Sequence, residues 1–197
     1  MKDKFTKRAQ KQGFKARSVF KLEDINKKYK LIKKNQRILD LGCWPGSWSQ
    51  YCLKILENTG LIVGVDIKEV SNLDIIFIKK DIFDKDIVNV INEISDIFDL
   101  VLSDIAPKTT GIQDSEASIE LSERALYITL RVLKYNGNFL VKVFQGKDLN
   151  NYINKLKHHF RFVKATKPIA SKKTSKEIYI ICLGKRWKNG NKICWCK

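Results

Sequence analysis

A short apolar run that leads into a glycine-containing turn constrains the fold of this chain more than any other feature. The run over 38–41 ends at Gly42, and a helix-like segment begins after Gly46. A strand that enters such a turn and continues as a helix is how an open α/β sheet makes a ligand crevice at its carboxyl edge. Glycine at both positions lets the backbone approach a ligand where a Cβ would clash. The segment therefore predicts a ligand site.

A second apolar run ends at Asp66, 20 residues beyond Gly46. An acidic side chain at that spacing suits the hydroxyls of a ribose, so the pair of features predicts an adenosine-containing cofactor. A dehydrogenase is one alternative, but the turn lacks the G-x-G-x-x-G pattern of dinucleotide-binding folds.

Strand-like runs alternate with helix-like stretches along the chain. Strands are expected at 37–41, 61–66, 75–78, 98–103, 138–144, 161–165 and 177–183, and helices at about 47–57, 84–96, 114–134 and 147–158. Alternation of this kind predicts an α/β fold, a doubly wound Rossmann-like sheet, mostly parallel, with helices on both faces. The last two strands have no helix between them, so we expect an antiparallel hairpin and one antiparallel edge strand.

Length and charge divide the chain into three parts. Its 197 residues, 44% hydrophobic, suit one globular domain with a sizeable core, and no apolar run is long enough to span a bilayer. Apolar residues at helical spacing between Ala16 and Tyr29 predict an N-terminal helix that packs on the body. We expect a basic, helical N-terminal segment over 1–34, the main domain over 35–184 and a basic tail over 185–197.

The basic charge is concentrated rather than spread evenly. The chain has 38 Lys and Arg against 21 Asp and Glu, a formal net charge of +17. Residues 1–34 hold 13 basic and 3 acidic side chains, whereas residues 56–104 hold 4 basic and 11 acidic ones. A Lys-rich solvated surface is the simpler interpretation. Clustering of this degree favours a polyanion such as nucleic acid, because each Lys or Arg near a phosphate releases a counterion.

Five cysteines, an odd and scattered set, do not form the pattern of a disulfide framework and indicate a reducing intracellular compartment. Cytoplasm, nucleolus, mitochondrion and plastid all remain open, because a presequence can have been removed. Cys194 and Cys196 resemble a metal-binding pair, together with His158 and His159, but no second close cysteine pair supports them. We therefore expect no metal.

Four charged residues stand out because they interrupt apolar runs or lie at their ends: Lys21, Asp104, Lys142 and Glu177. A solvated strand end or a lysine that extends its ammonium to water accounts for Lys21 and Glu177 taken singly. It does not account for Lys142, whose neighbours on both sides are strongly apolar and whose burial is costly without a partner.

Five blocks of the chain, in order, resemble the FtsJ/RrmJ family of S-adenosylmethionine-dependent RNA ribose 2′-O-methyltransferases. The blocks are Phe20-Lys-Leu22, Asp40 to Gln50, Ser103-Asp-Ile-Ala-Pro107, Val141-Lys-Val-Phe-Gln-Gly146 and Glu177-Ile-Tyr179. The family's Lys-Asp-Lys-Glu catalytic tetrad falls on Lys21, Asp104, Lys142 and Glu177. The resemblance implies a methyl transfer in which Lys142 contacts the 2′-hydroxyl as base or as positioning donor. Asp104 would orient Lys142, and Glu177 would fix Lys21 or the ribose.

The same resemblance implies a site for S-adenosylmethionine. Its residues are Asp40, Gly42, Pro45, Gly46, Ser47, Trp48, Asp66, Asp81 and Asp104. Asp40 would brace the glycine turn, and Asp81 would lie near the adenine amine, although a simple turn residue is the alternative there. Cys43-Trp44 stands where the family has two small residues, so Trp44 is expected either to reshape the cofactor pocket or to turn outward to solvent.

RNA is the expected substrate, held by the basic N-terminal face. The residues expected to touch phosphates are Lys4, Lys7, Arg8, Lys11, Lys15 and Arg17. The compact chain resembles the ribosomal RNA enzymes, which implies large-subunit rRNA as the target, with uridine as the expected nucleotide, and a monomer. A tRNA anticodon loop is the nearest alternative. A non-catalytic RNA-binding or ribosome-assembly factor is the alternative from another class, and such a protein has no need of the four charges.

Overall fold

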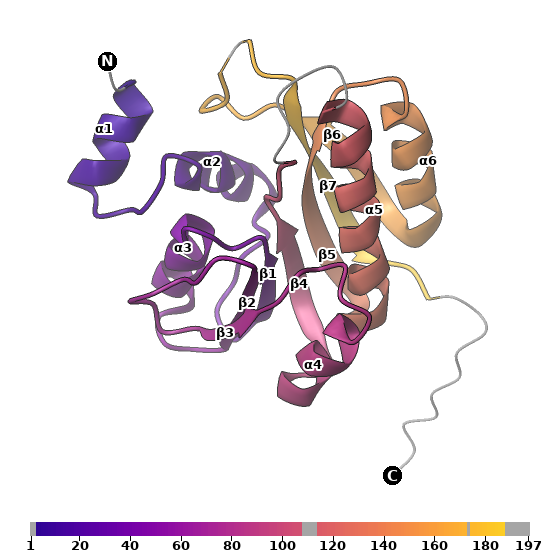
Figure 1. The fold of residues 1–197 in the computed structure, drawn as a ribbon, viewed down its shortest axis with the longest axis horizontal. Helices are drawn as coiled ribbons and strands as arrows, with labels where there is room; N and C mark the ends of the chain where they lie inside the picture. The colour runs from indigo at the N-terminus through magenta and orange to yellow at the C-terminus, as the bar shows by residue number, and fades with distance from the viewer. Residues whose placement is uncertain (1–2, 108–113, 173, 188–197) are drawn as a thin grey trace.

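Seven strands form one mixed sheet in the computed structural model, which describes residues 3–107, 114–172 and 174–187 (Figure 1). The strands are β1 (Arg37–Leu41), β2 (Leu61–Asp66), β3 (Ile76–Lys79), β4 (Phe98–Ser103), β5 (Leu133–Phe144), β6 (Phe160–Thr166) and β7 (Glu177–Lys185). The helices are α1 (Lys4–Lys11), α2 (Val19–Tyr29), α3 (Ser47–Leu56), α4 (Ile87–Ile94), α5 (Asp114–Val132) and α6 (Leu149–His159).

The sheet order β3-β2-β1-β4-β5-β7-β6 confirms the predicted fold class. Strands β3, β2, β1, β4 and β5 are parallel, and β7 runs antiparallel to both β5 and β6. The predicted hairpin forms, but β7 inserts between β5 and β6, so the antiparallel strand lies one place in from the edge. The reason is burial: β7 is apolar along nearly its whole length, whereas β6 is mostly exposed.

Helix α1 is the main element that the sequence patterns did not predict. Asp3 begins it, because the carboxylate accepts hydrogen bonds from the Phe5 and Thr6 N–H groups at 2.9 and 3.0 Å. Its apolar side, with Phe5 and Ala9, packs on Phe20 of α2. These contacts hold α1 against α2, the helix that the spacing between Ala16 and Tyr29 predicted.

The two faces of the sheet are covered by different helices. On one face, Leu22 and Ile25 of α2 and Cys52 of α3 pack against Leu100 and Leu140 of the central strands. On the other face, α4, α5 and α6 pack against the alternate residues of the same strands (Figure 1). Because side chains alternate along a strand, Lys142 shares the α2 and α3 face with Leu140. The fold thus places this lysine beneath the N-terminal segment.

The turn after β1 needs glycine at its first position. Gly42 has φ +73°, and a Cβ built there would lie 2.3 Å from Ile105 Cγ1. Gly13 has nearly the same φ, +72°, but nothing lies within 4 Å of its Cβ position. Both glycines have a left-handed backbone, but a Cβ would meet neighbouring atoms only at Gly42. A comparison of the two positions therefore distinguishes the cost of the backbone conformation from the cost of a steric clash.

We expect Gly42→Ala to destabilise the fold more than Gly13→Ala. Both substitutions carry the left-handed backbone cost of about 1 kcal/mol. Gly42→Ala adds an overpacking cost of about 1–3 kcal/mol, because Ile105 and the turn must shift apart. The free energies of unfolding from urea titration measure the difference, and equal losses in the two variants would contradict the steric argument.

Candidate active site

The glycine turn is tied to the end of β2. The Gly42 N–H donates to the Val65 carbonyl at 2.8 Å, and the Trp44 N–H donates to Asp66 Oδ2 at 2.9 Å. The other oxygen of Asp66 accepts the Lys68 N–H at 2.8 Å. Asp66 therefore joins the loops that follow β1 and β2.

A cavity of about 620 Å³ opens where β1, β2, β3 and β4 end. It is lined by Gly42, Trp44, Val65–Lys68, Lys80–Phe83, Asp104–Pro107, Ala117, Glu120 and Leu121. This is the carboxyl edge of the parallel strands, where the sequence predicted a ligand crevice. Gly42, Asp66, Asp81 and Asp104 are the predicted cofactor residues that line it.

The cavity carries negative charge in a strongly basic chain. Its lining includes four carboxylates, Asp66, Asp81, Asp104 and Glu120, against two ammonium groups, Lys68 and Lys80. A lining with this imbalance favours a cationic ligand over an anionic one. The Asp81 carboxylate also accepts the Phe83 N–H at 3.0 Å, so it both shapes its turn and faces the cavity.

Pro45, Gly46, Ser47 and Trp48 do not line this cavity. The Ser47 hydroxyl lies 2.8 Å from the Ser18 hydroxyl, and Trp48 Nε1 donates to the Ser18 carbonyl at 3.0 Å. The Trp48 ring is buried, with its centroid 5.8 Å from that of Tyr179. These residues join the start of α3 to the start of α2. The sequence places Ser47 and Trp48 next to a glycine turn, but it does not show which way their side chains point.

Asp40 is buried on β1, two residues before Gly42, and its hydrogen bond is with α3. Ser49 Oγ donates to Asp40 Oδ2 at 2.6 Å, which ties β1 to α3. The pKa of Asp40 is raised to about 7, chiefly by burial; the Ser49 hydrogen bond opposes this rise, and the charges of Asp104 and Asp66 add to it. Its other oxygen is buried without a hydrogen-bond partner. Asp40 is therefore poised to hold a proton in the folded protein at neutral pH.

Trp44 lines the rim of the cavity and also faces solvent. Its side chain is 50% exposed, and the Lys68 ammonium lies 4.2 Å from the ring centroid. The structure combines the two expected positions, because the indole both lines the cavity and is half exposed.

The four charges singled out in the sequence come together as two ion pairs. Lys21 Nζ lies 2.6 Å from Glu177 Oε1, and Lys142 Nζ lies 3.0 Å from Asp104 Oδ1. Lys142 also donates to the Asp104 carbonyl at 2.6 Å. Of the two roles considered for Glu177, the structure shows the contact with Lys21. Asp104 belongs to the cavity lining as well, so the cluster meets the cavity at this residue.

Tyr179 joins the two ion pairs, and sequence reasoning did not identify it. Its hydroxyl donates to Asp104 Oδ1 at 2.8 Å, while the Lys21 ammonium lies 5.8 Å from its ring centroid. In the β5–β7 register Tyr179 is opposite Lys142, and Glu177 is opposite Phe144. Tyr179 is two residues from Glu177, which places both side chains on one face of a strand, but this spacing alone does not distinguish it from an ordinary core tyrosine.

The six basic residues expected to contact RNA divide into two groups. Lys4, Lys7 and Lys11 are exposed and spaced so that they lie along one side of α1. Arg8, Lys15 and Arg17 make contacts within the protein. Arg8 pairs with Glu23 at 3.3 Å, Lys15 donates to the Ser71 carbonyl, and Arg17 donates to the Ala170 carbonyl at 2.7 Å.

The described cysteines Cys43, Cys52 and Cys182 are free, buried thiols whose pKa values are raised by burial. Within residues 3–107, 114–172 and 174–187, no group of three or more His, Cys, Asp or Glu side chains is placed to hold a metal ion. Cys194 and Cys196 lie outside the described residues. No helix in the described part of the chain is long and apolar enough to cross a membrane.

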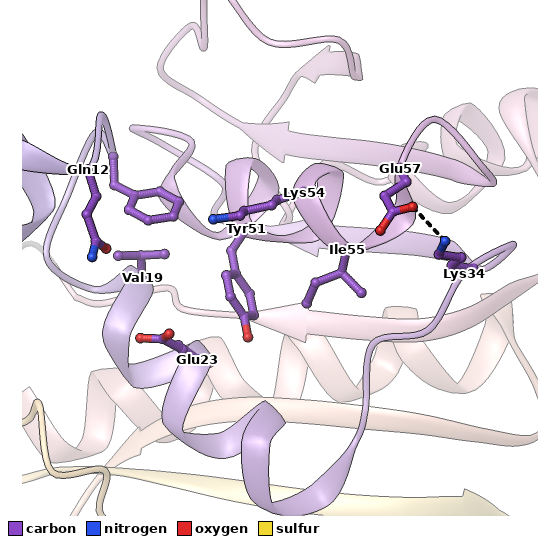
Figure 2. A pocket seen from close by; sticks show the side chains of 9 residues that line it. Gln12, Val19, Glu23, Lys34, Tyr51, Lys54, Ile55 and Glu57 are labelled. Atoms are coloured by element: carbon purple, nitrogen blue, oxygen red, sulfur yellow. Dashed lines mark hydrogen bonds and ion pairs between the residues drawn. The ribbon is translucent and has the colours of Figure 1, made fainter.

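A second cavity, of about 670 Å³, lies between α2 and α3 (Figure 2). Val19 and Glu23 of α2 and Tyr51 of α3 line it, and Lys34 and Glu57 pair at one end with 2.6 Å between Nζ and Oε2. Because Lys21 is two residues from both Val19 and Glu23, it lies on a different side of α2. This cavity is therefore separate from the four-charge cluster.

The sheet order and the cavity at the carboxyl edge of its parallel strands are those of an open α/β ligand-binding fold. The FtsJ-like methyltransferase model matches residues 14–185, so the chain belongs to that family, which implies a methyl donor.

Relatives and a solved structure agree with the family. The ribosomal RNA large subunit methyltransferase E of Desulfatibacillum aliphaticivorans is 42% identical, over 94% of this chain and 91% of its own. That of Bdellovibrio bacteriovorus is 41% identical, over 94% and 97%. A crystal structure described as a ribosomal RNA methyltransferase from Plasmodium falciparum is 31% identical, with a TM-score of 0.80, and the match covers 87% of this chain and 98% of that one.

We expect stability to depend on pH through Asp40. Its folded pKa of about 7 lies above the ordinary value of 3.8, so between those pH values the folded state binds a proton that the unfolded state lacks. The free energy of unfolding therefore falls as pH rises from about 4 to 7, by about 3–4 kcal/mol, and levels off above pH 7. Asp40→Asn removes this slope.

Urea unfolding of the wild type and of Asp40→Asn across pH 4–8 measures the effect. Ser49→Ala is the control, because it removes the hydrogen bond but retains the titrating carboxyl, and thus retains the slope. The same slope in Asp40→Asn would show that another group causes it.

Proposed function

We propose that this protein transfers a methyl group from S-adenosylmethionine to a ribose 2′-hydroxyl of large-subunit ribosomal RNA. The observation that carries the proposal is the cluster of Lys21, Glu177, Lys142 and Asp104, which reaches the cavity at Asp104. The names of the relatives favour ribosomal RNA as the substrate. A protein that only binds RNA gains nothing from two buried lysines paired in this way.

The residues at the edge of the sheet fit S-adenosylmethionine. The ligand is a cation at its sulfonium, and the lining carries four carboxylates against two lysines. Gly42 permits a close approach of the backbone, and Asp66 and Asp81 are the residues that would hold the ribose and the adenine amine. Asp40 would support the turn from beneath. When bound, the donor supplies an electrophilic methyl group, so the protein has mainly to place the acceptor oxygen in line with it.

Lys142 is the residue that we assign to the acceptor oxygen. An ammonium has three N–H donors, and Asp104 accepts from this one through its carbonyl and its carboxylate. The remaining donor is available to the 2′-oxygen, which it would orient and polarise. Tyr179 fixes the Asp104 carboxylate, and Glu177 fixes Lys21 as a second cation near the ribose. The pairing of Lys142 with Asp104 favours the positioning role over that of a base.

RNA would lie along α1 and reach the cluster over α2. We assign phosphate contacts to Lys4, Lys7 and Lys11, which are exposed on one side of α1. In this scheme residues 1–34 form the RNA-binding segment, residues 35–184 the catalytic domain and residues 185–197 a basic tail. Arg8, Lys15 and Arg17 would position the segment rather than touch RNA, since each contacts another part of the protein.

We expect Lys142→Met to lose methyl transfer by about a hundredfold or more, because the donor to the acceptor oxygen is removed. Labelled methyl from S-adenosylmethionine is offered to total rRNA, ribosomal particles and tRNA in parallel. Lys164→Met, which removes an exposed lysine of β6, is the control and retains activity. Label in tRNA alone would transfer the proposal to tRNA, and equal activity of wild type and Lys142→Met would refute the catalytic assignment.

We expect the triple variant Lys4→Gln, Lys7→Gln and Lys11→Gln to bind RNA more weakly and with less dependence on salt. Each lost phosphate contact lowers the slope of log affinity against log salt by about 0.7–0.9. Affinity for S-adenosylmethionine is unchanged, since α1 does not line the cavity. A triple Lys→Gln variant at Lys85, Lys157 and Lys164 removes the same charge elsewhere. Equal salt slopes in the two triple variants would contradict the assignment to α1.

A further inference from the structure

Arg124 of α5 holds the loop that follows β3 from outside the cavity. Its Nε donates to the Ile82 carbonyl at 2.5 Å, and its Nη2 donates to the Asp84 carbonyl at 2.8 Å. The two acceptors flank Phe83 and follow Asp81, and residues 80–83 form one wall of the cavity. A single guanidinium thus spans both carbonyls of the loop.

Arg124 lies directly behind the cavity wall without forming part of it. Glu120 and Leu121, four and three residues earlier on α5, line the cavity, and residues at these spacings lie on the same side of a helix. The loop is held at its interior side as well, because the Ile82 side chain is buried in the core. The carbonyl groups of the loop therefore meet α5 through Arg124.

The same guanidinium supports the exposed aromatic ring of the wall. Its central carbon lies 6.0 Å from the Phe83 ring centroid and 4.6 Å from that of Tyr127. Phe83 is 44% exposed and lines the cavity, so burial alone does not fix its ring. A planar cation between two rings restricts both of them.

We infer that Arg124 is a positioning residue for the methyl donor, acting through the loop 80–84 rather than by contact with the ligand. The inference rests on the proposed function, because it assigns the cavity to S-adenosylmethionine. Arg124 fixes the backbone that carries Asp81 and Phe83, and so preforms the wall that the donor meets. Its effect falls on donor binding and not on the transfer step, which takes place at Asp104 and Lys142.

The test compares Arg124→Met with Arg131→Met. Arg131 is on the same helix, and its guanidinium lies 3.5 Å from the Tyr127 ring centroid, but it donates to a carbonyl of its own helix, that of Tyr127. Arg124→Met should raise KM for S-adenosylmethionine about tenfold, the change that a loss of roughly 1.4 kcal/mol produces, and leave kcat within about twofold. Arg131→Met should change neither. Arg124→Lys should be intermediate, since one ammonium does not span both carbonyls.

Two further measurements separate positioning from a general loss of structure. Calorimetric titration with S-adenosylmethionine and S-adenosylhomocysteine gives binding without RNA, and amide hydrogen exchange at Phe83 and Asp84 should become faster in Arg124→Met alone. If Arg124→Met does not fold, Arg124→Lys carries the test. Donor binding equal to wild type, or a loss confined to kcat, would overturn the inference. A wild type that binds neither ligand would overturn the proposed function and the inference with it.

Discussion

The rest of this structure depends on the pairing of two buried lysines, Lys142 on an apolar face of the sheet and Lys21 on the helix α2. Lys142 is 7% exposed and Lys21 is 8% exposed. Removing an ammonium from water costs several kcal/mol unless a close acceptor compensates. Glu177 supplies that compensation for Lys21 and Asp104 supplies it for Lys142, while Tyr179 donates to Asp104 and lies beside Lys21. The two ion pairs therefore constrain the fold independently of any ligand that the cluster binds.

The antiparallel strand β7 is what makes this pairing possible. In the β5–β7 register Lys142 is opposite Tyr179, and Glu177 precedes Tyr179 by two residues on β7, on the same side of the strand. A slip of one residue would turn these side chains to the face covered by α5. The insertion of β7 beside β5 makes the sheet mixed rather than purely parallel. It does so at the place where the four charged side chains pair.

Charged residues within apolar runs could be predicted from the sequence, and residues defined by their partners could not. Lys142 and Asp104 were recognisable because burial of a charge is costly. Tyr179 was not, since a tyrosine in an apolar strand is an ordinary core residue. Arg124 leaves no pattern, because its acceptors are backbone carbonyls distant in sequence. The strand and helix order followed from periodicity. The position of β7 between β5 and β6 depends on its burial against these two strands. The alternation of side chains along one strand does not reveal which strands will be its neighbours.

The uneven charge along the chain separates two surfaces of opposite sign. The acidic stretch 56–104 contributes Asp66, Asp81 and Asp104 to the cavity, whereas the basic stretch 1–34 contributes α1 and Lys21. Under the proposed function, a cationic donor and a polyanionic acceptor would be drawn to these two surfaces. They would meet at the cluster of two ammonium and two carboxylate groups, whose charges sum to zero. Because that cluster has no net charge, it can be covered by RNA on one side and by the donor on the other without leaving an unbalanced charge buried between them.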